Sequence, residues 1–190
     1  PDRIEAGTFL VAAALAGTEV TLRRVNAEHL NAVTNAITDA GFRLNIQRDS
    51  ITVYGNGAPQ PVDLITEPYP GFPTDMQAQM CALLSRANGE SSVMETVFPQ
   101  RFMHVSELKR MGADIALEGA TARINGVTRL SGAPVMASDL RASAALVLAG
   151  LVAEGTTEVN RVYHIDRGYE SIDEKLMGLG AEIERVKHQF

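Results

Sequence analysis

Three charged residues occupy matched positions along the sequence and could do chemistry together. Arg3, Asp75 and Arg141 each lie 14 residues before a glycine, because 17 − 3, 89 − 75 and 155 − 141 all equal 14. Arginine side chains bind phosphate and carboxylate groups, and a carboxylate can take the proton of an alcohol. Asp75 beside such arginines is therefore a candidate base for a reaction between an alcohol and an anionic substrate.

A second matched set is predicted at the starts of later helices. It consists of His29, Arg101 and Arg167, which lie 12, 11 and 13 residues before the glycines at positions 41, 112 and 180. Helix starts carry free N–H groups and a partial positive charge, so arginine is unfavourable there unless it has an anionic partner. A bound phosphate or carboxylate would be such a partner. Pairing of the arginines with nearby acids, such as Asp139 and Asp166, is an equally good interpretation.

Asp75 also has a structural interpretation. Residues 72–75 read Phe-Pro-Thr-Asp before an apolar run, a pattern in which Thr74 or Asp75 caps the helix N-terminus or lies favourably in its first turn. Taken alone, this spacing favours capping. Only the neighbouring arginines make Asp75 a candidate base.

Other reactive residue types give weaker signals. Cys81 lies inside an apolar run and is interpreted as an inert core thiol. His104 and His164 lack the spacing of a metal site, and the sequence has no glycine-rich phosphate loop. We therefore expect neither a metal nor a cofactor.

Three apolar helical runs organise the sequence. They cover residues 9–16, 76–88 and 142–154, and each leads to a glycine, at positions 17, 89 and 155. A short β-branched strand and a second helix follow each time, and the second helices end at the glycines at positions 41, 112 and 180. The steps between equivalent glycines are 72 and 66 for the first set and 71 and 68 for the second, which indicates a repeat of about 70 residues.

Each repeat is predicted to contain strand, helix, strand, helix, strand, strand. Alternating residues around 49–50 and 118–119 predict hairpins, and residues 62–66 and 133–137 predict opening strands. The first unit lacks its opening strand, and the third has only one hairpin strand, after position 180. The units cover about residues 1–58, 59–128 and 129–190.

The repeats predict one α/β domain over residues 1–190. A βαβαββ unit can cover its apolar faces only by packing against the other units. Three units would close into a pseudo-three-fold, inside-out barrel, with the apolar first helices at the centre and the sheets outside. The second helices carry more charge and are expected to be partly solvated.

Composition narrows the class of protein. The net charge of −6 argues against a general nucleic-acid or anionic-membrane binder. The longest apolar stretch, residues 9–16, is far below the roughly 20 residues that span a bilayer. With one cysteine and no leader pattern, we expect a cytoplasmic protein. The chain opens on Pro1 without an initiator methionine, which indicates a fragment.

Five ordered segments resemble the UDP-N-acetylglucosamine 1-carboxyvinyltransferase family over nearly the whole chain. They are PDRIEAGTFL at 1–10, FPTDMQAQ at 72–79, ETVF through RFMH at 95–104, DLRAS at 139–143 and YHIDRGYE at 163–170. The resemblance implies enolpyruvyl transfer from phosphoenolpyruvate to the 3-hydroxyl of UDP-N-acetylglucosamine, the committed step of peptidoglycan synthesis. It also implies two similar domains with the active site between them.

The resemblance implies a role for each matched site residue. Asp75 would act as the base when the sugar hydroxyl adds to C2 of phosphoenolpyruvate, and Arg167 would bind the carboxylate of that substrate. The remaining implied contacts to substrate or members of the surrounding charged cluster are Thr74, the backbone of Val97, Phe98, Arg101, Asp139 and Arg141.

One part of the family pattern is missing. The family's reactive cysteine belongs to a mobile loop of the other domain, and Cys81 lies in no matching motif. We therefore expect this chain alone to be inactive and the rest of the polypeptide to be its partner. A non-enzymatic scaffold or a relative of RNA 3′-phosphate cyclases is the competing interpretation, which the acidic charge disfavours.

Overall fold

The structure is a computed structural model that describes residues 2–55 and 57–186. Its first region folds as one antiparallel sheet with two helices. The elements are α1 (Arg3–Ala16), β1 (Glu19–Arg23), the 3-10 turn η1 (Ala27–Leu30), α2 (Asn31–Asp39), β2 (Arg43–Ile46) and β3 (Ser50–Tyr54). The strand order is β1-β3-β2. Ile51 and Val53 of the central strand are buried, so this alternating strand turns one face to the core.

The second region contains a complete strand, helix, strand, helix, strand, strand sequence in a single sheet. The elements are β4 (Asp63–Ile65), η2 (Thr74–Met76), α3 (Gln77–Leu84), β5 (Glu90–Met94), α4 (Met103–Arg110), β6 (Asp114–Glu118) and β7 (Thr121–Asn125). The strand order is β4-β5-β7-β6, with β4 parallel to β5 and the other pairs antiparallel. The predicted opening strand at 62–66 and hairpin around 118–119 are confirmed here.

The third region pairs its strands two by two. The elements are β8 (Leu130–Ser131), β9 (Pro134–Met136), α5 (Leu140–Gly150), β10 (Ala153–Glu154), β11 (Glu158–Asn160), η3 (Val162–Arg167) and α6 (Ile172–Gly178). β9 lies parallel to β11, and β8 lies parallel to β10. The predicted hairpin strand after position 180 is wrong for residues 181–186, which join no sheet. A strand needs a hydrogen-bonded neighbour, and the described part of the chain supplies none at this place.

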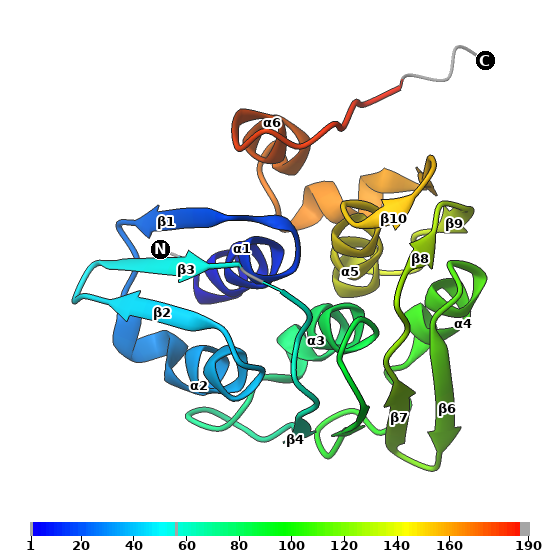
Figure 1. The fold of residues 1–190 in the computed structure, drawn as a ribbon, viewed down its shortest axis with the longest axis horizontal. Coiled ribbons are helices and arrows are strands. Elements are labelled where there is room, and N and C mark those ends of the chain that lie inside the picture. The colour runs from blue at the N-terminus through cyan, green and yellow to red at the C-terminus, as the bar shows by residue number, and fades with distance from the viewer. Residues whose placement is uncertain (1, 56, 187–190) are drawn as a thin grey trace.

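The helices α1, α3 and α5 lie side by side at the centre of the molecule, with β1, β2 and β3 to one side and β6 and β7 to another (Figure 1). All residues of α3 are buried, which agrees with its lack of a polar face. Runs of alanine in α1 and α5, such as 12–14 and 144–145, are also buried. Small side chains let these helices approach closely.

The second helices end in one repeated motif. Each is followed by a glycine with positive φ, at +90° for Gly41, +88° for Gly112 and +96° for Gly180. Each glycine N–H donates to the carbonyl three residues earlier, and the next N–H donates to the carbonyl five residues before it. These are Schellman caps, in which glycine avoids the strain of a left-handed backbone. The predicted ends of these helices are confirmed.

Glycine does not end two of the first helices, so that prediction was wrong for α3 and α5. α3 ends at Leu84, before Gly89, and α5 ends at Gly150, before Gly155. Ser85 continues in helical geometry while its hydroxyl bonds the Cys81 carbonyl at 2.7 Å. The two glycines instead lie next to strands, at φ +147° and +88°, where they allow the chain to reverse direction.

Candidate active site

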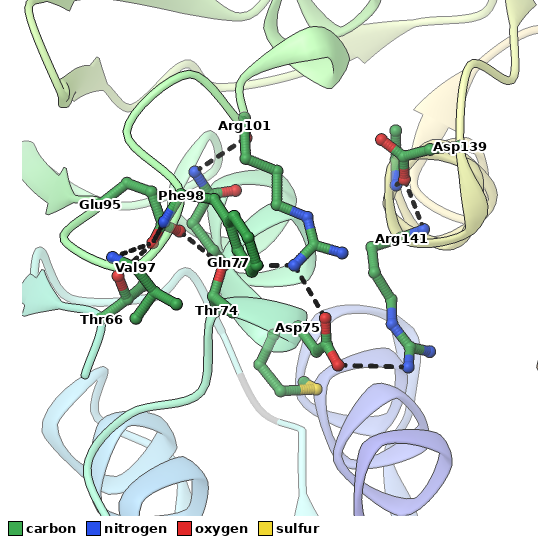
Figure 2. Close-up of polar contacts among 12 residues, drawn as sticks. Thr66, Thr74, Asp75, Gln77, Glu95, Val97, Phe98, Arg101, Asp139 and Arg141 are labelled. Carbon is green, nitrogen blue, oxygen red and sulfur yellow. Dashed lines mark hydrogen bonds and ion pairs between the residues drawn. The ribbon is translucent and has the colours of Figure 1, made fainter. Parts of the chain in front are cut away.

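The site lies where the starts of α3 and α5 meet the loop before α4. The Asp75 carboxylate accepts from Arg101 Nη1 at 2.8 Å and from Arg141 Nη2 at 3.5 Å. The two guanidinium groups approach Asp75 from different parts of the fold (Figure 2). The Asp75 side chain keeps 38% exposure, so the carboxylate can still be reached from outside.

Asp139 places Arg141 by capping α5. Its side chain accepts from the backbone N–H groups of Arg141 at 2.7 Å and Ala142 at 2.8 Å. Such a cap satisfies N–H groups that the helix leaves free and fixes the direction of its first turn. The Arg141 side chain leaves that turn toward Asp75 (Figure 2).

Of the structural interpretation of Thr74 and Asp75, the side-chain cap was wrong, whereas Asp75 does lie in the first turn, that of η2. Neither η2 nor α3 has a side-chain capping hydrogen bond at its start. Thr74 Oγ1 instead donates to Glu95 Oε2 at 2.8 Å and accepts from Arg101 Nη1 at 3.3 Å. Because the arginines hold the Asp75 carboxylate, it is turned away from the helix backbone.

The predicted pairing of arginines with Asp139 and Asp166 was also wrong. Asp139 bonds backbone N–H groups, and Asp166 accepts from Arg185 at 2.8 and 2.9 Å. Both site arginines share Asp75. The error comes from sequence proximity, since the acid that pairs with Arg141 lies 66 residues away in the chain.

Glu95 is a buried carboxylate outside the predicted set of site residues. Its Oε1 accepts from the Thr66 hydroxyl at 2.6 Å and from the backbone N–H groups of Val97 at 2.9 Å and Phe98 at 3.0 Å. With the bond from Thr74, four donors surround this side chain, which is 1% exposed. Glu95 therefore shapes the loop from residue 95 to Arg101. A lone acid ending a β-branched strand was the available signal.

The loop ends are held as well. Gln77 Nε2 donates to the Arg101 carbonyl at 3.3 Å, and the Arg101 guanidinium carbon lies 5.5 Å from the centre of the exposed Phe98 ring. This contact is of cation–π type. Arg101 thus contacts Thr74, Phe98 and Asp75, and Val97 is held in the same loop by Glu95 (Figure 2).

Arg167 is the predicted site residue that the structure does not bring into this cluster. It ends η3 and is exposed. Within residues 2–55 and 57–186, its side chain takes part in no hydrogen bond or ion pair. Arg167 and His29 lie in η3 and η1, and Arg101 lies two residues before α4. The predicted starts of the second helices were therefore too early.

Burial suppresses the chemistry of two other titratable side chains. It raises the pKa of the Cys81 thiol to about 12, with a smaller contribution from the charge of Glu95, so the prediction of an inert core thiol is confirmed. Burial is the main cause that lowers the pKa of His104 to about 4. The charge of Asp139 opposes this shift, and the charge of Arg101 adds to it. Within residues 2–55 and 57–186, no group of three or more His, Cys, Asp or Glu is placed to hold a metal ion.

A hollow of about 440 Å³ lies away from Asp75 and contains none of these site residues. It is lined by the last turns of α1 and α5 and by residues 176 to 182. Most of its lining is alanine, glycine and leucine, which provide few groups for polar recognition.

No helix in the described ranges is long and apolar enough to cross a membrane.

The site combines one reachable carboxylate with two fixed cations. Asp75 can accept the proton of a hydroxyl group, and Arg101 and Arg141 can stabilise negative charge on a phosphate or carboxylate. The backbone N–H groups of Val97 and Phe98 in the adjoining loop are already occupied by Glu95. The arrangement suits the addition of an alcohol to an anionic acceptor.

Comparison with known sequences supports a specific relationship. The relative from Akkermansia muciniphila, a UDP-N-acetylglucosamine 1-carboxyvinyltransferase, is 61% identical over 188 residues, which are 98% of this chain and 44% of the relative. A relative of the same name from an Anaeromyxobacter species is 61% identical over 186 residues, again 98% and 44%. The chain therefore spans less than half the length of the curated relatives it matches.

Solved structures show the same fold. The enolpyruvyl transferase NikO from Streptomyces tendae aligns with a TM-score of 0.87 at 28% identity, covering 96% of this chain and 43% of that protein. An EPSP synthase from Acinetobacter baumannii aligns with a TM-score of 0.64 at 22% identity, covering 83% and 38%. The chain has the mixed α/β fold of enolpyruvyl transferases.

The family model of EPSP synthase matches residues 1–176. This range includes the Asp75 site, the central helices and the Schellman caps of α2 and α4. Because the match covers most of the sequence, the chain belongs to the EPSP synthase (3-phosphoshikimate 1-carboxyvinyltransferase) family.

Proposed function

We propose that the complete gene product transfers the enolpyruvyl group of phosphoenolpyruvate to the 3-hydroxyl of UDP-N-acetylglucosamine and releases phosphate. This would be the first committed step of peptidoglycan synthesis. The observation that carries the proposal is the identity of 57–61% to relatives named for this transfer. Identity to the aligned EPSP synthase structure is 22%, and nothing favours a scaffold or an RNA cyclase.

Asp75 is the proposed base. Its carboxylate would take the proton of the 3-hydroxyl while that oxygen bonds to C2 of phosphoenolpyruvate and C3 gains a proton. Loss of the C3 proton and departure of phosphate from C2 would then give the enol ether. The contact of Asp75 with Arg101 and Arg141 supports this role, because both cations could face the anionic intermediate.

The substrate contacts follow from which groups remain available. The Val97 N–H is bonded to Glu95, so its carbonyl is the backbone group that we assign to UDP-N-acetylglucosamine, with Thr74 and Phe98 beside it. Asp139 would act through Arg141, which it positions. Arg167 is exposed, and we assign it to the phosphoenolpyruvate carboxylate from the edge of the site.

The domain proposal is that residues 1–190 form one domain of three units, at about 1–58, 59–128 and 129–190, in a pseudo-three-fold inside-out barrel. The complete element order of the second region and the three Schellman caps support it. Other segments of the polypeptide would add the strands missing from the first and third units. A second domain would supply the cysteine acid at C3.

The remaining expectations follow from these substrates. A reaction between two phosphorylated metabolites with no redox step calls for no cofactor, and it would take place in the cytoplasm. Nucleic acid and membrane are not expected partners, in keeping with the net charge of −6.

The test is a transfer assay on the complete gene product with the Asp75→Asn variant. Wild type should release phosphate from phosphoenolpyruvate with UDP-N-acetylglucosamine and not with shikimate 3-phosphate. Asp75→Asn should lose on the order of 10²–10⁴-fold in kcat, while Asp63→Asn, an exposed carboxylate on β4, should not. The 190-residue chain alone should show no turnover. Transfer to shikimate 3-phosphate instead, or a fully active Asp75→Asn, would overturn the proposal.

A further inference from the structure

A closed ring of hydrogen bonds connects the side-chain carboxylate and the backbone carbonyl of Asp75 to the buried helices. From its carboxylate the ring passes to Arg141, whose Nη1 donates to Tyr169 Oη at 3.2 Å, and Tyr169 Oη lies 2.9 Å from Thr8 Oγ1. Gln79 Nε2 donates to Thr8 Oγ1 at 3.0 Å and to the Asp75 carbonyl at 2.9 Å. The ring therefore returns to the residue where it began.

The three inner members of the ring are distant in sequence and buried. Thr8 belongs to α1, Gln79 to α3, and Tyr169 follows η3. Their exposures are 1%, 0% and 2%. Buried polar groups of this kind are costly unless they are bonded, and here the partners come from three separate parts of the fold. Their positions are thus fixed by the packing of the whole helix cluster.

Each hydrogen bond of the ring can be assigned a donor and an acceptor without conflict. The Thr8 hydroxyl has a single hydrogen, and the carbonyl of Ile4 lies 2.9 Å away as its acceptor. Thr8 then accepts from Gln79 and from the Tyr169 hydroxyl. The Tyr169 oxygen then accepts from Arg141 Nη1 at 3.2 Å and from Gln79 Nε2 at 3.4 Å, and the guanidinium carbon of Arg141 lies 5.6 Å from the centre of the tyrosine ring.

Arg141 depends on Tyr169 more than Arg101 does on any buried group. Within the described ranges, the polar partners of the Arg141 side chain are Tyr169 at 3.2 Å and Asp75 at 3.5 Å. Arg101 holds Asp75 at 2.8 Å and also bonds Thr74. A long flexible side chain with a 3.5 Å contact needs a second anchor to stay in place.

We propose that Tyr169 is a positioning residue that holds Arg141 against Asp75, with Thr8 and Gln79 as its supports. The importance of this for turnover rests on the proposed function of Asp75 and Arg141. The hydroxyl oxygen of Tyr169 is the element of the ring that can be removed alone. Tyr169→Phe keeps the buried aromatic side chain and its contact with the guanidinium, but it breaks the ring of hydrogen bonds.

The first test is spectroscopic and independent of catalysis. In ¹⁵N NMR of the protein, the guanidinium NH₂ signals of Arg141 should show slow rotation in wild type and faster rotation in Tyr169→Phe. The matched control is Tyr54→Phe. The guanidinium carbon of Arg43 lies 3.7 Å from the centre of the Tyr54 aromatic ring, and neither residue belongs to the ring of hydrogen bonds. Unchanged Arg141 signals in a folded Tyr169→Phe variant would overturn the proposal.

The second test separates positioning from folding. In the complete gene product, Tyr169→Phe should lower kcat by about tenfold to a hundredfold, as a small misplacement of a catalytic group does, with a smaller change in KM. Thr8→Val removes the acceptor of the Tyr169 hydroxyl and should act in the same direction. Thr8→Ser keeps that acceptor and should restore kcat.

The outcomes distinguish this inference from the proposed function. If wild type transfers no enolpyruvyl group but Tyr169→Phe frees the Arg141 guanidinium, the function is wrong and the positioning contact stands. If wild type is active and both Tyr169→Phe and Thr8→Val keep full kcat, the function stands and the positioning role is wrong. Equal loss in Thr8→Ser and Thr8→Val would also contradict it, since only one of them lacks the hydroxyl.

Discussion

The two ends of the central helices are built in opposite ways. At their starts, Asp75 and Arg141 contact each other, Arg101 reaches Asp75 from the loop before α4, and Arg141 connects to buried hydrogen-bonded groups. At their other ends, α1 and α5 border a hollow of about 440 Å³ lined by small and apolar residues. Hydrogen bonds fix positions through direction, whereas apolar contacts depend on how completely space is filled. Substitutions should therefore have sharply different costs at the two ends.

The largest loss of stability at the polar end is expected at Glu95. Glu95→Leu would leave two backbone N–H groups and two hydroxyls without the acceptor that they now share. Each orphaned buried donor costs about 1–3 kcal/mol, and part of this is relieved by relaxation. We expect a loss of about 3–5 kcal/mol in the free energy of unfolding, measured by urea denaturation.

Asp63 provides the matched control for Glu95. It also accepts from a backbone N–H and a hydroxyl, those of Ser92 at 2.9 and 2.7 Å, but it is exposed. Water can replace its bonds, so Asp63→Ala should cost less than about 1 kcal/mol. Equal costs for Glu95→Leu and Asp63→Ala would show that the loop does not depend on the buried carboxylate.

The next effect depends on pH and concerns His104 in the first turn of α4. Burial lowers its pKa from 6.5 to about 4 in the folded protein. Between these values the unfolded chain binds a proton that the folded chain refuses, so stability is intact above pH 6.5 and falls as the pH drops to 4. The loss should reach about 3 kcal/mol, and His104→Leu should remove this part of the pH dependence.

A substitution beside His104 distinguishes a loss of stability caused by titration from one caused by a change in side-chain volume. Phe102 lies with its ring centre 6.1 Å from that of His104 and is buried. Phe102→Leu should lower stability by a similar amount at every pH, because it changes no titratable group. The His104 interpretation fails if wild type and His104→Leu lose stability in parallel between pH 6.5 and 4.

The sequence predicted which helix starts form the site, because equivalent positions in repeated helices are expected at the same end of the fold. Counting back from matched glycines placed Asp75 and Arg141 at equivalent helix starts, and in the structure they touch. The ends of α2, α4 and α6 were predictable for a local reason, since glycine after a helix favours the left-handed cap. Both successes use information that is contained in a short stretch of chain.

The rest depended on partners that no local pattern reveals. Glu95, Gln79 and Tyr169 look like isolated polar residues in the sequence, and their roles follow from donors brought from other regions. Arg167 shared the spacing of the site residues but lies exposed on η3. Helix α5 stopped before Gly155 because β10 pairs with β8, a contact between distant segments.

The smallest effect is expected at the open end of α1 and compares two alanines of one helix. Ala16, the last residue of α1, lines the hollow and is exposed, whereas Ala14 is buried and does not line it. Ala14→Leu must displace packed neighbours and should cost about 1–3 kcal/mol, while Ala16→Leu can extend into open space and should stay within about 0.5 kcal/mol of wild type. Thermal and urea denaturation of both variants measure the difference. Equal costs would mean that the surroundings of Ala16 are as tightly packed as those of Ala14, and the contrast between the two ends of the central helices would then concern polarity alone.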